Sequence, residues 1–99
     1  INGNIKIIDI GNINAIKLII NCNLIAKKIS INNCQLLEII HLDSFIIEFI
    51  FLYSLYKMKH FVINCKLFAK MAIKQCSELQ SITGTITGSI RNSLLTISN

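Results

Sequence analysis

A nearly unbroken apolar segment, residues 45–58 (FIIEFIFLYSLYKM), constrains the fold of this chain more than any other feature of its sequence. A membrane-spanning helix needs about 20 apolar residues. A window of that length would take in two or three of Glu38, Asp43 and Glu48, and each acid is unfavourable by roughly 2.5–3.5 kcal/mol near the bilayer centre. The segment is therefore predicted to be a buried helix of a globular domain and not a membrane span.

Asp43 and Ser44 stand immediately before this predicted helix, which would extend over 44–58. A side-chain oxygen at the N-cap accepts hydrogen bonds from the free N–H groups of the first turn, and the helix dipole favours negative charge there. Asp43 and Ser44 are therefore expected to cap the helix. Glu48 follows Ser44 by four residues and would border the same surface.

The remaining segments predict alternating strands and helices. Ile5 to Ile10 is a β-type run ended by a Gly-Asn turn signal, and apolar residues recur at helical spacing from Ile13 to Ile29. We expect strands at 5–10, 36–42 and 61–65 and helices at 13–29, 44–58 and 66–76. This βαβαβα order with short connections is typical of an α/β fold, in which helices pack on a small mixed β-sheet. Residues 81–99 are expected to be an extension, either an edge strand and a short helix at 90–97 or a loose tail.

Metal binding and catalysis find little support in the sequence. The four cysteines (Cys22, Cys34, Cys65 and Cys76) form no C-x-x-C pair, and neither histidine lies at ligand spacing from them. Reduced, buried thiols and a reducing compartment are expected instead. His41, Asp43 and Ser44 are adjacent, but strand alternation and the helix turn would point them apart. No catalytic residue, cofactor or metal site is predicted.

The charge of the chain is mildly basic, with a formal net charge of +5 from scattered lysines. Lys66, Lys70 and Lys74 would form a basic stripe on the last helix. Such a stripe is usually a solvated helix face, although it could meet an acidic partner. Without a basic run longer than two residues, nucleic acid is not the expected partner.

The block LLEIIHLDS, the apolar segment after it, and the segments FVINC and LFAKMAIKQC together resemble the STAS domain family. That family includes anti-sigma-factor antagonists and the small cytoplasmic subunit of Mla-type phospholipid ABC transporters. The resemblance implies a STAS-like domain over 1–80 and a regulatory or partner-binding site at Asp43, Ser44, Phe45 and Glu48. Phe45 departs from the small residue that normally follows Asp-Ser in the family.

The resemblance implies a non-enzymatic, cytoplasmic protein-interaction module. Its first form is an accessory subunit of a phospholipid ABC transporter, whose partner would be the ATPase or the permease. The alternative is an anti-sigma-factor antagonist that is phosphorylated on Ser44 and binds an anti-sigma kinase. A third possibility, of another class, is a ribosomal or organellar structural protein from an AT-rich genome, suggested by the basic balance and the abundance of Ile and Asn.

Overall fold

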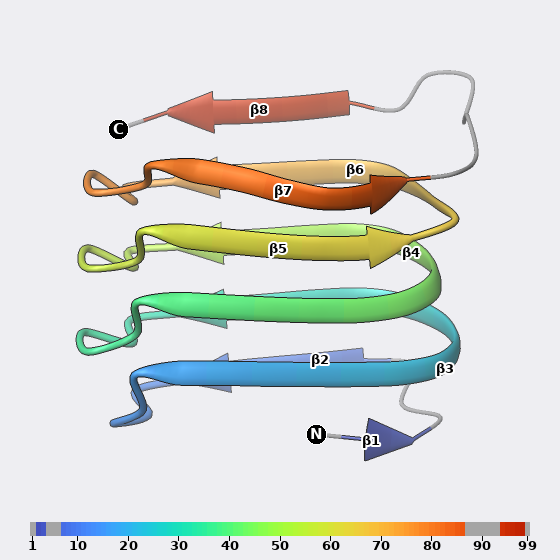
Figure 1. The fold of residues 1–99 in the computed structure, drawn as a ribbon, viewed down its shortest axis with the longest axis horizontal. Coiled ribbons are helices and arrows are strands. Elements are labelled where there is room, and N and C mark those ends of the chain that lie inside the picture. Colours follow the sequence, from blue (N-terminus) through green and yellow to red (C-terminus); the bar gives the residue numbers. More distant parts are fainter. Residues whose placement is uncertain (1, 4–6, 87–93, 99) are drawn as a thin grey trace.

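The computed structural model describes residues 2–3, 7–86 and 94–98, and every regular element in these residues is a β-strand. The chain winds into a β-solenoid in which strands on the nearer side run left to right and strands on the farther side run back (Figure 1). The strands are β1 (Asn2–Gly3), β2 (Ile7–Gly11), β3 (Lys17–Asn32), β4 (Ile39–Tyr53), β5 (His60–Cys65), β6 (Leu67–Lys74), β7 (Ser81–Ile86) and β8 (Leu94–Ser98).

Two layers of parallel strands face each other across the core. The long strands β3 and β4 bend and contribute to both layers, since the first part of β4 pairs with β5 and its second part pairs with β6. We call the layer of β1, 17–22, 39–44, β5 and β7 the β5 layer, and the layer of β2, 25–32, 46–53, β6 and β8 the β6 layer. Each complete coil of the solenoid therefore supplies one strand segment to each layer.

The coils repeat every 21 residues over most of the described chain. Residues 39, 60 and 81 are in register, and so are residues 46 and 67. As a result, buried side chains stack on their equivalents in the next coil, and these stacks form the hydrophobic core. The stacks are Ile29, Ile50 and Met71; Ile31, Leu52 and Ile73; Cys34, Leu55 and Cys76; Leu37 and Met58; and Ile40 and Phe61.

A left-handed residue directly follows four of the β6-layer strand segments, at the ends of β2, β3, β4 and β6. Asn12, Asn33, Ser54 and Gln75 have φ values of 57°, 52°, 55° and 54°, at positions 21 residues apart. Asn tolerates this region better than most residues because its short polar side chain can bond locally. The backbone N–H of Asn33 donates to the Tyr53 carbonyl at 3.1 Å, so the turn keeps the hydrogen-bonding pattern between coils. The turn therefore reverses the chain and continues the ladder.

The α/β prediction is wrong, because the segments expected to be helices at 13–29, 44–58 and 66–76 lie largely in strands β3, β4 and β6. The error has a physical cause in the spacing of the buried residues. Within a strand, inward side chains are two residues apart, but at the turns and bends they are three apart, as at Ile47 and Ile50 or Leu52 and Leu55. A mixture of steps of two and three resembles the 3.6-residue period of an amphipathic helix.

The other predicted elements compare as follows. The strand expected at 61–65 is β5, and the strand expected at 36–42 begins only at Ile39. The strand expected at 5–10 overlaps β2 in its later part, and its residues 5–6 lie outside the described chain. Residues 81–86 form β7, which pairs with β5 in register. The helix expected at 90–97 is wrong for residues 94–97, which belong to β8, and its residues 90–93 lie outside the described chain.

The described residues contain no helix that is long and apolar enough to cross a membrane. The apolar segment at 45–58 instead contributes to both the core and the surface of one coil: Ile47, Ile50 and Leu52 are buried, whereas Phe49 and Tyr53 are exposed. The hydrophobicity of this segment therefore comes from two groups of side chains, one that fills the core and one that lies on the outer surface.

The turn geometry predicts different effects on stability for two substitutions of Asn33. A β-branched side chain is strained at φ 52°, so Asn33→Val is expected to destabilise the fold by about 1–2 kcal/mol. Asn33→Gly should be nearly neutral, because glycine adopts this conformation freely. Urea denaturation followed by circular dichroism measures both. Equal losses for the two variants would show that backbone conformation does not decide the stability of the turn.

The burial of the cysteine side chains predicts that their thiols are alkylated slowly in the folded protein. Cys34, Cys65 and Cys76 are buried free thiols, and the side chain of Cys22 lies outside what the structure describes. Burial raises the pKa of Cys65 and of Cys76, where a backbone hydrogen bond opposes the effect of burial in part. Because the thiolate is the reactive form, Cys65 and Cys76 should resist iodoacetamide at pH 8 until the protein is unfolded, and burial keeps the reagent from Cys34, which is 0% exposed. Peptide mass spectrometry would contradict this by finding them alkylated as fast as in denaturant.

Candidate functional site

The residues predicted as a single site do not share one surface. Asp43 lies on the outer face of the β5 layer, Ser44 follows at the bend of β4, and Glu48 lies beyond the bend in the β6 layer. The Ser44 hydroxyl donates to the carbonyl of Ile46 at 3.5 Å. Neither Asp43 nor Ser44 caps a helix, because the expected helix is absent. The side chain of Phe45 lies outside the described part of the structure.

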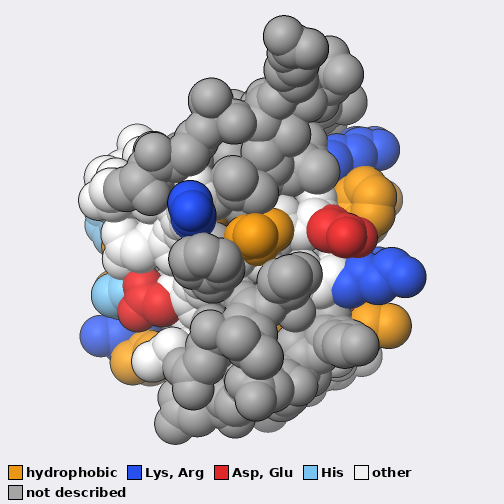
Figure 2. Space-filling model, turned by 90° about the vertical axis from the view of Figure 1, so that its right-hand side faces the viewer, with side chains coloured by type: hydrophobic (Ala, Val, Ile, Leu, Met, Phe, Trp, Pro, Cys, Tyr) orange, Lys and Arg blue, Asp and Glu red, His pale blue; other side chains and the backbone are white. Residues whose placement is uncertain are grey.

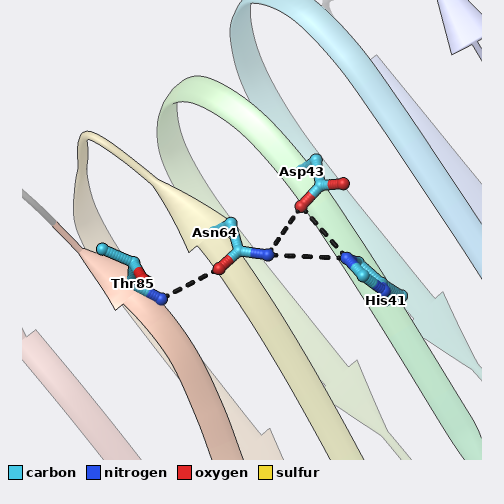
Figure 3. Close-up of polar contacts among 4 residues, drawn as sticks. All are labelled: His41, Asp43, Asn64 and Thr85. Carbon is cyan, nitrogen blue, oxygen red and sulfur yellow. Dashed lines mark hydrogen bonds and ion pairs between the residues drawn. The ribbon is translucent and has the colours of Figure 1, made fainter.

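A polar ladder on the β5 layer contains Asp43 and connects three coils (Figure 3). The side-chain amide of Asn64 donates to Asp43 Oδ1 at 2.9 Å, and its oxygen accepts from the backbone N–H of Thr85 at 2.9 Å. Asp43 and Asn64 are register partners, as are Asn64 and Thr85. The ladder therefore reinforces the stacking of coils from outside the core.

His41 completes this polar ladder. Its Nε2 lies 3.2 Å from Asp43 Oδ1 and 3.5 Å from the amide nitrogen of Asn64. The carboxylate can only accept, so the shorter contact requires Nε2 to carry the proton and donate to Asp43. Since side chains alternate along a strand, His41 and Asp43 share the outer face while Ser44 points the other way. The arrangement acts as a hydrogen-bonded bridge and does not align the Ser44 hydroxyl with the His–Asp pair.

The outer face of the β6 layer carries a different set of side chains, aromatic and basic. Phe49, Phe51 and Tyr53 alternate along β4 and point outward, and the exposed fractions of Phe49 and Tyr53 are 38% and 45%. Lys28 and Lys70 are the register partners of Phe49 in the neighbouring coils, and Lys74 is a partner of Tyr53. We call this the aromatic–lysine surface; it comprises Lys28, Phe49, Phe51, Tyr53, Lys70 and Lys74.

Phe51 is the centre of this surface. Its neighbours across the strands are the small residues Ser30 and Ala72, so the longer lysine side chains can reach over them. The ammonium groups of Lys28 and Lys70 each lie 5.9 Å from the centroid of the Phe51 ring, within the range of a cation–π interaction. Ala72 is only 7% exposed although it lies outside the core cluster. This is expected if the side chains of Phe51 and the two lysines cover it.

Figure 2 shows how the two layers differ at the surface. Histidine and acidic side chains lie along its left-hand edge, together with lysine and hydrophobic side chains, where the β5 layer is seen from the side. Lysine, acidic and hydrophobic side chains lie one above another along its right-hand edge, which belongs to the β6 layer. The histidines therefore lie on the side of the β5 layer, opposite the aromatic–lysine surface of the β6 layer.

Sequence reasoning missed the aromatic–lysine surface because it assigned its residues to three helices, at 13–29, 44–58 and 66–76. The available signal was that aromatic residues (Phe49, Phe51 and Tyr53) alternate with aliphatic ones, because residues two apart lie on the same face of a strand. Lys70 and Lys74 were assigned to a helical stripe, yet their four-residue spacing also places them on one face of a strand. Glu48 lies beside Phe49 in this region, so one of the predicted site residues borders the surface.

Metal binding has no geometric support in the part of the chain that the structure describes. Nowhere in those residues do three or more His, Cys, Asp or Glu side chains gather as a metal ion would require. His60 Nδ1 lies 2.8 Å from the Ser81 hydroxyl, a contact between neighbouring coils. Both histidines of the chain are therefore engaged in contacts along the β5 layer.

The polar ladder predicts a pH-dependent effect of Asn64→Asp. The new carboxylate would face Asp43, and repulsion would raise the pKa of both groups in the folded state. A raised pKa contributes stability below the unfolded-state value, near 4, that is lost as the pH rises. The variant should therefore lose about 1–2 kcal/mol at pH 7 and approach wild-type stability at acid pH.

The control for this measurement is Thr83→Asp, which adds a carboxylate to the same layer but not at the position in register with Asp43. Urea midpoints of both variants would be compared with wild type between pH 3 and 7. A loss for Asn64→Asp that is independent of pH, or equal for the two variants, would contradict the role of the Asp43–Asn64 contact.

Comparison with protein-family models, curated proteins and solved structures found no match. The resemblance to the STAS family therefore has no support from relatives. The fold that the resemblance implied is contradicted, because helices packed on a sheet are replaced by two layers of parallel strands.

Proposed function

We propose that this chain is a non-enzymatic protein-binding module that uses the aromatic–lysine surface of its β6 layer. The observation that carries the proposal is the outward row of Phe49, Phe51 and Tyr53 along one strand, with Lys28 and Lys70 in register on either side. Single exposed apolar residues are ordinary, whereas aligned aromatic side chains are typical of interfaces.

The solenoid suits this role because its backbone supports a fixed outer surface. Parallel ladders hold the three neighbouring coil segments of the surface in register, so the side chains are presented with little freedom of the backbone. Solenoid proteins commonly bind partners through such extended surfaces. A preorganised surface loses less conformational entropy on binding.

The specific roles that the STAS resemblance implied are not part of this proposal, since they depend on a fold that the chain does not have. The coarser expectation of a protein partner is kept. Location in a reducing compartment such as the cytoplasm is also proposed, supported by the buried free thiols of Cys34, Cys65 and Cys76. The ribosomal alternative gains no support, because the described lysines form no continuous basic path.

Site-specific photocrosslinking in living cells tests the proposal. A photoreactive phenylalanine analogue would replace Tyr53 on the aromatic–lysine surface, and Thr83 on the β5 layer as a control. We expect a discrete crosslinked protein from position 53 only, since an interface restricts contact to one face. An excess of the unlabelled chain should abolish that product, whereas the same chain carrying Phe49→Ser and Tyr53→Ser should compete poorly.

Crosslinks of equal yield from the two positions would contradict the proposal, because they would indicate random collisions. A product that is destroyed by ribonuclease would also contradict it, since the partner would then be RNA. Circular dichroism of the competitor variant must match wild type, so that loss of competition reports the surface and not unfolding.

A further inference from the structure

The lysines of the aromatic–lysine surface carry charges that the described part of the chain does not neutralise. The ion pairs found there are His41 with Asp43 and Lys59 with Glu38, and neither involves this surface. The ammonium groups of Lys28 and Lys70 contact the Phe51 ring instead. A ring face attracts a cation without cancelling its charge, so both groups stay available to an anion.

The balance of charge on this side of the molecule is positive. Lys27 and Lys28 are exposed on β3, Lys74 is exposed on β6, and Lys70 is partly exposed. The acids of the same layer are Asp9 on β2 and Glu48 on β4. The surface therefore complements a negatively charged partner, and rim charges of this kind select and steer partners.

Two of the three aromatic rings of this surface, Phe49 and Phe51, are poorly placed to stack nucleic-acid bases. Phe49 and Phe51 already stack on each other, with ring centroids 6.2 Å apart and an interplanar angle of 15°. Two lysine ammonium groups lie over the Phe51 ring. Single-stranded nucleic acid needs open ring faces on which successive bases can stack. The geometry thus favours a partner that brings carboxylates and apolar side chains and not bases.

We infer that the partner contributes an acidic segment in which carboxylates flank an apolar side chain. The carboxylates bind the ammonium groups of Lys28 and Lys70, and the apolar side chain covers the exposed rings of Phe49 and Tyr53. This inference rests on the proposed protein-binding function and specifies its chemistry. Covering the rings removes water from the cation–carboxylate contacts and strengthens them.

A peptide-binding experiment tests the inference with the folded chain. The probe is a fluorescein-labelled peptide in which Glu and Leu alternate, and the control peptide alternates Gln and Leu. Fluorescence anisotropy should show saturable binding of the Glu–Leu peptide, weakened by salt, and much weaker binding of the Gln–Leu peptide. Fluorescein-labelled oligothymidylate provides the nucleic-acid arm of the test.

Matched variants locate the binding site. Lys28→Gln and Lys70→Gln should each weaken binding of the Glu–Leu peptide by about two- to fivefold, the range typical of exposed ion pairs. The double variant should weaken it roughly tenfold, because each lysine contacts a separate carboxylate. Lys17→Gln, on the outer face of the β5 layer, removes the same charge elsewhere and should leave the affinity unchanged. Lys28→Gln and Lys70→Gln each remove a cation–π contact with Phe51, so their melting temperatures should fall by at most a few degrees, while circular dichroism shows that every variant is folded at the temperature of the binding measurement.

Each other outcome overturns the inference in an identifiable way. Equal binding of the Glu–Leu and Gln–Leu peptides, or equal effects of Lys17→Gln and Lys28→Gln, would show that carboxylates are not recognised at this surface. Tighter binding of oligothymidylate with the same lysine dependence would assign the surface to nucleic acid. If the Glu–Leu peptide does not bind while the crosslink from position 53 persists, the protein-binding function stands and only the acidic chemistry is wrong.

Discussion

Register between coils is the constraint on which the rest of this structure depends. The strands are parallel, so each strand segment pairs with the equivalent segment of the next coil and not with the segment of the other layer that adjoins it in the chain. A shift of one residue would turn Ile29, Ile50 and Met71 outward together, because strand side chains alternate. The stacks of buried side chains therefore fix the register, and the register then fixes every row on the outside.

The outer faces are free to differ once the register is set, and the two layers use this freedom differently. On the β5 layer, Asp43 and Asn64 are in register and bond to each other, which adds polar support to the stacking. On the β6 layer, Phe49 stands between two lysines, and these reach across small neighbours to Phe51. The first arrangement forms hydrogen bonds between coils within the molecule, whereas the second leaves cationic and aromatic groups for a partner.

The sequence supports the prediction of individual strands better than the prediction of the fold. The strand expected at 61–65 is correct, and buried and partly exposed side chains alternate along it in the structure. In the segment 45–58, the buried residues Ile47 and Ile50 are three positions apart, and Ile50 and Leu52 are two apart. Within a single segment, this mixed spacing cannot be distinguished from the apolar face of a helix. The decisive signal was the recurrence of equivalent residues, such as Cys34, Leu55 and Cys76, at 21-residue intervals. Chemical type varies along such a row, so the repeat is visible only when apolar character is compared over several coils.

The lysines around Phe51 also oppose the packing of this β-surface against a second copy of itself. Exposed aromatic residues on a parallel layer would favour face-to-face packing of two such layers, as in the interfaces between β-sheets of fibrils. Lys28 and Lys70 oppose this, because face-to-face packing of two copies would bring like charges together as the surface is desolvated. An acidic segment meets no such penalty, since its carboxylates neutralise the same ammonium groups. One pair of side chains can thus disfavour self-association and favour the proposed partner, and this dual effect follows from their position beside the aromatic row.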